Sequence, residues 1–265
     1  SDLSASVHGY NSSKKQSKQK KQKKKMTMEL DTTQLLLLSG VVLLGMEILT
    51  RIVPFVCELL QVSKIPIKGK HLDELEGIDK LYITINQGFT CLFVYHLILV
   101  STSVDTIKLA ADEVTVSNTL GSLLLFYLFY DFWYWAFHWF LHIRELYPWI
   151  HKHHHRQKAP SRGNPDAINV HPVEYVIGEY LHLLTIYLIP CHIYAVVFFI
   201  LAGGILASLN HTRYNVKWGP IYNVDVHDVH HRIPHSNYAQ YHMLYDRLFG
   251  TYYPYDSKVA KSQTE

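Results

Sequence analysis

Several signatures of familiar protein classes are absent from this chain of 265 residues. Its three cysteines, Cys57, Cys91 and Cys191, all lie in apolar runs and at no ligand spacing, so we expect them to pack rather than to form a disulfide framework. The chain has no GxGxxG or P-loop motif for binding nucleotides and no HExxH motif of a zinc hydrolase. It also lacks the internal repeat that many transporters carry.

Charged residues are scarce as well, at 18% of the chain, whereas hydrophobic residues make up 48% and are gathered into long runs. Such runs are too long for a soluble core, but they match a hydrocarbon layer about 30 Å thick. We expect three spans, at about residues 31–60, 81–104 and 116–138. Within the first span, Glu47 and Arg51 stand one helical turn apart, where they neutralise each other. The sequence therefore predicts an integral membrane protein.

Residues 1–25 differ from the rest, since they carry eight lysines and show no apolar periodicity. We expect a disordered tail there, followed by one domain at 26–265. A contact with anionic lipid or nucleic acid is the functional alternative. A solvated tail, or sequence upstream of a start at Met26 or Met28, is favoured. The positive charge of residues 1–25 exceeds the net charge of the whole chain, which is +3, so the rest of the chain has a net negative charge. We therefore expect no nucleic-acid partner.

The apolar run from Val173 to Leu209 contains Pro190 near its middle. A single long span would place the histidines before and after it on opposite sides of the membrane. We therefore expect a turn near 189–192 and two short spans. The expected fold class is all-α: a polytopic membrane helix bundle of about three spans, then a helical hairpin, with a metal-binding cap. Basic residues such as Arg144 and Lys152 predict, by the positive-inside rule, that the cap faces the cytosol. We expect the membrane to be that of the endoplasmic reticulum.

Histidine is abundant, and it is clustered. His138 and His142 are four residues apart, and two later clusters repeat offsets of three and four. In helices, each cluster would form one stripe of imidazoles. The candidate ligands are His138, His142, His151, His154, His155, His227, His230 and His231. Eight rings exceed the roughly four ligands of one zinc ion, and imidazole suits iron, zinc, copper and nickel, so two metal ions are predicted.

Several polar residues outside these clusters are also candidates for a role at the site. Asp131 lies seven residues before His138, on the same helix face and deeper in the membrane, where an ionisable side chain is costly. We expect it to orient a ligand histidine or to line a substrate channel. A hydrogen bond to a Tyr or Ser of a neighbouring helix is the alternative. His153, His235 and His242 fall outside the repeated spacing and are expected to be exposed or to support the ligands.

In its three histidine boxes the chain resembles the fatty acid hydroxylase and sterol desaturase superfamily, membrane enzymes with a di-iron centre. The resemblance runs from about Leu120 to Pro254. It includes HPVE at 171–174, NHTRYN at 210–215 and the segment at 237–254, which look like parts of the sterol-modifying branch. It implies that the eight histidines bind two iron ions. His211 resembles an additional ligand, and His171 is either a ligand or a capping contact with Glu174.

The resemblance further implies an O2-dependent di-iron lipid oxidase that hydroxylates or desaturates a membrane lipid, with a sterol as the nearest substrate. Electrons from NAD(P)H would arrive through a separate protein of the cytochrome b5 or reductase type. No catalytic residue beyond the metal ligands is implied. A fatty acid or sphingolipid hydroxylase is the alternative within this class. A histidine-rich membrane protein that binds or transports metal is the alternative outside it, but transporters need ionisable residues at the midplane of several spans.

Two departures from the resemblance leave the exact reaction open. Tyr245 stands where sterol 5-desaturases have a tryptophan before the Asp-Arg pair, and the first box reads HWFLH, where the family often has a basic residue after the first histidine. The aromatic run from Phe126 to Phe140 suits the wall of a pocket for a rigid fused-ring substrate. It equally suits an anchor at the membrane interface.

Overall fold

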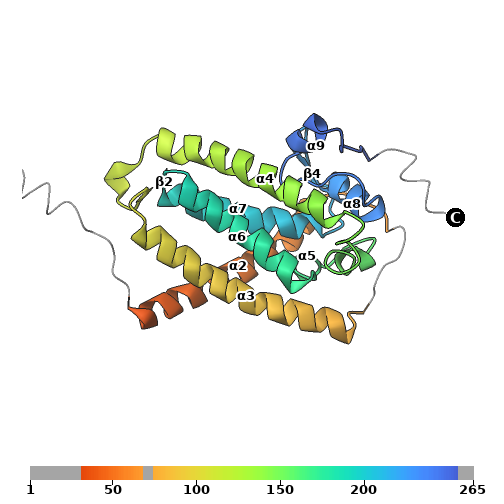
Figure 1. Ribbon diagram of the computed structural model, residues 1–265, viewed down its shortest axis with the longest axis horizontal. Coiled ribbons are helices and arrows are strands. Elements are labelled where there is room, and N and C mark those ends of the chain that lie inside the picture. Colours follow the sequence, from red (N-terminus) through yellow and green to blue (C-terminus); the bar gives the residue numbers. More distant parts are fainter. Residues whose placement is uncertain (1–30, 68–73, 256–265) are drawn as a thin grey trace, which may run out of the picture.

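The computed structural model describes residues 31–67 and 74–255. The lysine-rich tail expected at 1–25 lies outside the described residues. Five long helices form a bundle (Figure 1). They are α2 (Thr32–Leu59), α3 (Gly77–Ser103), α4 (Ser122–Leu141), α6 (Pro172–Leu188) and α7 (Ile193–Asn210). A π-helical turn, η2 (Ser117–Gly121), leads into α4. The all-α helix bundle is therefore confirmed.

The two ends of the bundle differ (Figure 1). At one end, β1 (Ile107–Lys108) pairs in parallel with β2 (Cys191–His192), near the 3-10 turn η1 (Ala111–Glu113). The other end carries most of the short elements. These are η3 (His154–Arg156), α5 (Asn164–Ala167), the antiparallel strands β3 (Lys217–Trp218) and β4 (Tyr222–Asn223), α8 (Val224–Arg232) and α9 (Leu244–Leu248). All three histidine boxes lie at this second end, so the predicted cap is present.

Four helices in the described part of the chain are long and apolar enough to cross a membrane: Thr32–Leu59, Gly77–Ser103, Ser117–Leu141 and Ile193–Asn210. They match the expected spans and the second arm of the hairpin. The first arm, α6, is 17 residues long. The hairpin turns between Leu188 and Ile193, as expected from Pro190, and the Ser122 hydroxyl donates to the Pro190 carbonyl at 2.7 Å. The turn therefore returns the chain to the histidine end.

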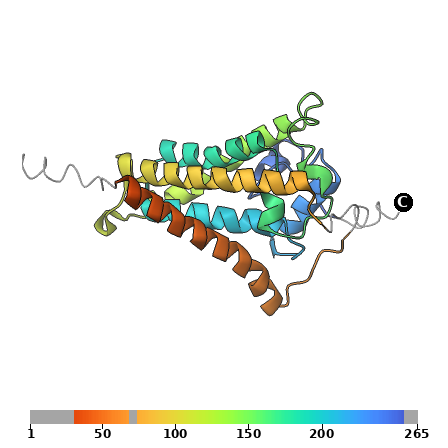
Figure 2. The same cartoon turned by 90° about the horizontal axis from the view of Figure 1, so that it is seen from below.

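Burial separates a central helix from a peripheral one. Half of the apolar window of α7 is buried, against 6% for α2. The exposed leucines of α2, such as Leu37 and Leu59, face outward, as expected of a helix in contact with lipid. In Figure 2, α2 separates from the other helices toward the histidine end.

The predicted ion pair in the first span and the predicted packing of the cysteines can be compared with the structure. Glu47 and Arg51 form the expected ion pair at 2.9 Å. The three cysteines are free, and Cys57 and Cys191 are buried. Cys91 is exposed on α3, so the expected packing role is wrong for this residue.

Candidate metal centre

The first and third histidine boxes lie on helices, but the second does not. His138 is in the last turn of α4, and His142 caps that helix. The third box lies on α8, whereas the second lies in consecutive turns that end in the 3-10 helix η3. The expectation of three helical stripes is therefore wrong for the second box. Tight turns bring its imidazoles together because they too place residues three and four apart near one another.

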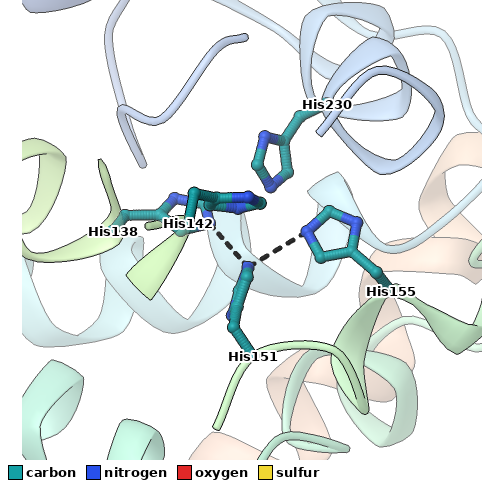
Figure 3. A group of neighbouring side chains, drawn as sticks. All are labelled: His138, His142, His151, His155 and His230. Atoms are coloured by element: carbon teal, nitrogen blue, oxygen red, sulfur yellow. Dashed lines mark hydrogen bonds between the residues drawn. The ribbon is translucent and has the colours of Figure 1, made fainter. Parts of the chain in front are cut away.

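The nine histidines singled out in the sequence converge into two buried groups, and within each the candidate ligand atoms lie within 4.8 Å of one another. The first group is His138, His142, His151, His155 and His230 (Figure 3). The second is His154, His211, His227 and His231. The second and third boxes each contribute to both groups, so neither group can form without them. His211, the residue after α7, joins the second group.

Hydrogen bonds to the far side of the rings fix how several imidazoles point. The Nδ1–H of His138 donates to the Tyr238 carbonyl at 2.8 Å, and that of His211 donates to the Ala207 carbonyl at 2.8 Å. His230 and His231 donate in the same way to the carbonyls of Ser236 and Gln157, at 2.6 and 3.0 Å. A carbonyl only accepts, so the proton of each neutral ring is on Nδ1 and its Nε2 carries a bare lone pair.

These bare nitrogens lie against one another. Nε2 of His138 is 3.0 Å from Nε2 of His151, and Nε2 of His227 is 3.2 Å from Nε2 of both His211 and His231. Lone pairs repel at such distances unless a cation lies between them. The donor set therefore fits a bound metal in each group, since imidazole is a common ligand of iron and zinc.

Burial keeps these imidazoles neutral. Desolvation lowers the pKa of His142 to about 2, with the neighbouring His138 lowering it further. The pKa values of His151, His230 and His231 are also held well below the usual range, mainly by burial and then by adjacent histidines. Neutral imidazole is the form that binds metal, so the site is ready to bind at neutral pH.

An acidic residue, Glu174, supports the first histidine group. Glu174, the second residue after the start of α6, accepts a hydrogen bond of 2.7 Å from Nδ1 of His151. It therefore orients a candidate ligand, as carboxylates commonly do at metal sites. His171 belongs to neither group; its Nδ1 accepts from the Val173 N–H at 3.2 Å and caps α6. The capping role expected for His171 is therefore observed, but with the Val173 N–H as its partner instead of Glu174, because the side chain turns back onto its own helix.

The role expected for Asp131 also needs correction. Its carboxylate accepts from the backbone N–H groups of Gln240, Tyr241 and His242, at 2.8, 2.9 and 3.0 Å. It orients no ligand histidine, does not line the cavity described below, and uses backbone donors rather than a Tyr or Ser side chain. Its helix face points toward the segment after the third box, which is hydrogen-bonded to α4. The sequence indicates that a buried Asp131 needs partners, but their identity depends on this long-range contact.

Further buried acids hold the cap together. Asp246 accepts from the N–H groups of Tyr238 and Ala239, at 2.8 and 3.0 Å, and so fixes the carbonyl that orients His138. Asp228, inside the third box, pairs with Arg213 and, at 2.8 Å, with Arg232. The sequence could have indicated both acids, because Asp228 lies inside the third box and Asp246 lies within the motif that follows it.

The histidines that do not follow the three- and four-residue spacing lie near the two histidine groups but belong to neither. His153 contacts the buried Asp79 at 3.2 Å and the Asn169 side chain at 2.8 Å. His242 pairs with Asp131 at 3.1 Å, and His235 lies on the exposed side of His142. The supporting or exposed positions expected for these three are observed.

A cavity of about 480 Å³ runs through the bundle to the first histidine group. Its wall includes Tyr130, Tyr134 and Phe137 on one face of α4, and it ends beside His138 and Leu141. The volume is within the usual range for small-molecule sites, about 300–1,000 Å³. Other aromatics of the run, Trp133 and Trp139 among them, are exposed. One face of the aromatic run therefore walls a cavity and another faces outward, so each of the two expectations holds for part of it.

The family model for fatty acid hydroxylase matches residues 123–251, which include all but the first residue of α4, the hairpin and every histidine of both groups. The match covers just under half of the 265-residue chain. The resemblance carried by the histidine boxes is thus confirmed. No solved structure matches the chain.

The curated proteins that the chain resembles include several whose names refer to sterols. The chain is 29% identical to cholesterol 25-hydroxylase-like protein 1, member 2, of Danio rerio, over 52% of this chain and 51% of that protein. It is 28% identical to Delta(7)-sterol-C5(6)-desaturase of Nicotiana tabacum, over 44% of each chain. It is also 28% identical to methylsterol monooxygenase 1 of Rattus norvegicus, over 56% of this chain and 51% of that protein. The chain spans about half the length of the curated relatives it matches.

Proposed function

We propose that this protein is an O2-dependent membrane oxidase that hydroxylates or desaturates a sterol at a di-iron centre formed by the two histidine groups. The observation that carries the proposal is the cavity, which begins among membrane-spanning helices and ends at His138. A lipid that enters from the membrane can therefore reach the candidate metal site without crossing water. The names of the relatives support a sterol as that lipid.

Two bound iron ions would supply the oxidation of an unactivated C–H bond by dioxygen. The first group would hold one ion and the second group the other. The chain's own contribution is to hold the Nε2 atoms in place through their Nδ1 bonds and to exclude water, because all nine rings are buried. The cavity wall brings one part of the substrate beside His138.

Hydroxylation and desaturation both need two electrons and two protons for each O2 consumed. The chain has no GxGxxG or P-loop motif, so we propose that a separate protein, of the cytochrome b5 or reductase type, delivers the electrons from NAD(P)H. Arg144 and Lys152 are exposed beside the first and second boxes, where an acidic donor protein would bind. We propose that this end faces the cytosol, as the positive-inside rule favours, and that the membrane is the endoplasmic reticulum.

A comparison of cellular lipids tests the proposal. Cells that lack the protein, cells that express it and cells that express His230→Ala are compared by mass spectrometry of sterols, fatty acids and sphingolipids. We expect a sterol intermediate to accumulate without active protein, while fatty-acid unsaturation and hydroxylation stay unchanged. If sterols are unaffected and 2-hydroxy or unsaturated acyl chains fall, the protein is instead a fatty acid or sphingolipid oxidase. No lipid change would favour a metal-binding or transport role.

A further inference from the structure

A buried polar pair lies in the cavity wall outside both histidine groups. Nε2 of His182, on α6, is 2.8 Å from the Tyr241 hydroxyl oxygen, which comes from the segment after the third box. The two side chains line the cavity, yet His182 is only 9% exposed and Tyr241 only 5%. Whichever ring nitrogen of His182 carries the proton, the Tyr241 oxygen keeps at least one lone pair for another partner.

Three neighbours hold this pair in position. Asp131 binds the backbone N–H of Tyr241, and the Tyr130 ring lies 3.9 Å from the His182 ring and 5.2 Å from the Tyr241 ring, centroid to centroid. Gly203 of α7 leaves the space that the pair fills. A Cβ atom at residue 203 would lie 2.6 Å from the Tyr241 oxygen and 3.5 Å from Nε2 of His182. A side chain here would therefore push the pair apart.

The pair lies at a defined depth below the metal centre. On each of three helices, the residue at the pair and a residue at a histidine group are eight positions apart. These are Tyr130 and His138 on α4, His182 and Glu174 on α6, and Gly203 and His211 at the end of α7. Eight residues of α-helix correspond to about 12 Å. The cavity thus has hydrogen-bonding groups at one level and candidate metal ligands about 12 Å away.

Two other polar contacts in the wall are weaker candidates for binding a substrate. The Thr90 hydroxyl already donates to the Asn86 carbonyl and contacts the Tyr175 hydroxyl at 2.6 Å. Glu47 and Arg51 are paired with each other, and their side chains are 42% and 79% exposed on α2. The pair of His182 and Tyr241 combines burial with free hydrogen-bonding capacity.

We propose that His182 and Tyr241 bind a hydroxyl group at one end of an elongated apolar substrate, which places the carbon to be oxidised about 12 Å from that hydroxyl. This inference rests on the proposed function and narrows it. A sterol bound by its ring hydroxyl would therefore be oxidised toward the side-chain end of the molecule. Ring carbons beside the hydroxyl-bearing carbon would lie too far from the first histidine group.

Equilibrium binding of cholesterol and its 3-deoxy analogue to the iron-loaded protein in nanodiscs tests the hydroxyl site. Wild type should bind cholesterol about five- to tenfold more tightly, the value of one net hydrogen bond. Tyr241→Phe should remove this preference and leave binding of the analogue unchanged. The matched control is Tyr127→Phe, whose ring packs against Tyr241 at 5.6 Å but does not line the cavity; it should keep the preference. Gly203→Ala, which displaces the pair, should act like Tyr241→Phe.

The position of oxidation gives a second reading, by mass spectrometry of the sterol product. Oxygen or a new double bond on the side chain is the expected result. Equal weakening of both ligands by Tyr241→Phe, or oxidation at a ring carbon adjacent to the hydroxyl-bearing carbon, would overturn the hydroxyl site. Either result would leave the sterol oxidase itself intact. Oxidation of acyl chains with no sterol binding would overturn both proposals.

Discussion

Asp131 and Tyr241 are 110 residues apart in the chain, and the Asp131 carboxylate accepts a hydrogen bond of 2.9 Å from the Tyr241 backbone N–H. The same carboxylate also binds the N–H groups of Gln240 and His242. One buried acid on a membrane-spanning helix therefore fixes the segment that begins just after Tyr238, whose carbonyl orients His138. The helix bundle and the candidate metal centre are connected through this contact.

Asp131→Asn should weaken the cap without changing any candidate ligand. An amide oxygen accepts less strongly than a carboxylate, and its NH2 group opposes the backbone N–H donors. We expect a loss of about 3 kcal/mol, since hydrogen bonds to charged groups contribute about 1.5–3 kcal/mol each. Thermal unfolding of the metal-free protein in detergent measures the loss. Asp105→Asn, at an exposed position, is the control; equal melting temperatures for the two variants would contradict this role of Asp131.

Glu174→Gln tests whether the charge of the carboxylate that accepts from Nδ1 of His151 strengthens metal binding. The amide oxygen still accepts from Nδ1, but the lost charge makes the imidazole a weaker ligand. Loss of such supporting groups typically costs about 10- to 100-fold in metal affinity. We expect iron to dissociate during dialysis against a chelator at concentrations that spare wild type. Glu145→Gln, in the exposed loop before the second box, should behave as wild type. Unchanged iron retention in Glu174→Gln would show that this contact is only structural.

Acid should destabilise the metal-free protein, because burial lowers the pKa of His151, His230 and His231 in the folded state. Below about pH 6.5 the unfolded chain binds protons that the folded chain excludes, so stability falls as pH falls. Each such group contributes a slope of up to about 1.4 kcal/mol per pH unit. Melting temperatures between pH 8 and pH 5 should therefore decrease. His231→Ala should flatten the slope, whereas His235→Ala, at an exposed position, should not. A melting temperature that rises toward pH 5 would contradict the account.

The sidedness of the membrane can be tested with single cysteines in a variant whose three native cysteines are replaced by serine. Gln61→Cys lies just after α2 at the histidine end, and Thr115→Cys lies at the opposite end, before η2; both positions are exposed. In sealed microsomes with the cytosolic face outward, a membrane-impermeant maleimide should label Gln61→Cys and spare Thr115→Cys. The reverse pattern would place the histidine cap in the lumen and contradict the positive-inside assignment.

Local spacing carried most of what the sequence could predict. His138 and His142 share a helix face because they are four residues apart, and Pro190 marks the turn of the hairpin because it interrupts an apolar run. His211 was identified by resemblance to the family. These features depend on residues close in sequence or on a motif, so they could be read without tertiary structure.

Contacts between residues far apart in the chain could not be predicted from spacing or motifs. Glu174 binds His151 across 23 residues, and His182 binds Tyr241 across 59, so each contact depends on how two helices pack. The distribution of the second box is a similar case. His154 joins one group while His151 and His155 join the other. Offsets of three and four identified the ligands but not their grouping.

Metal analysis of the anaerobically purified protein tests the central claim most directly. Two histidine groups, one of five rings and one of four, predict about two iron ions per chain. His227→Ala removes a ring from the second group alone and His142→Ala from the first alone, so each should lower the content toward about one ion and abolish activity. One zinc and no iron in the wild-type protein would contradict the di-iron account.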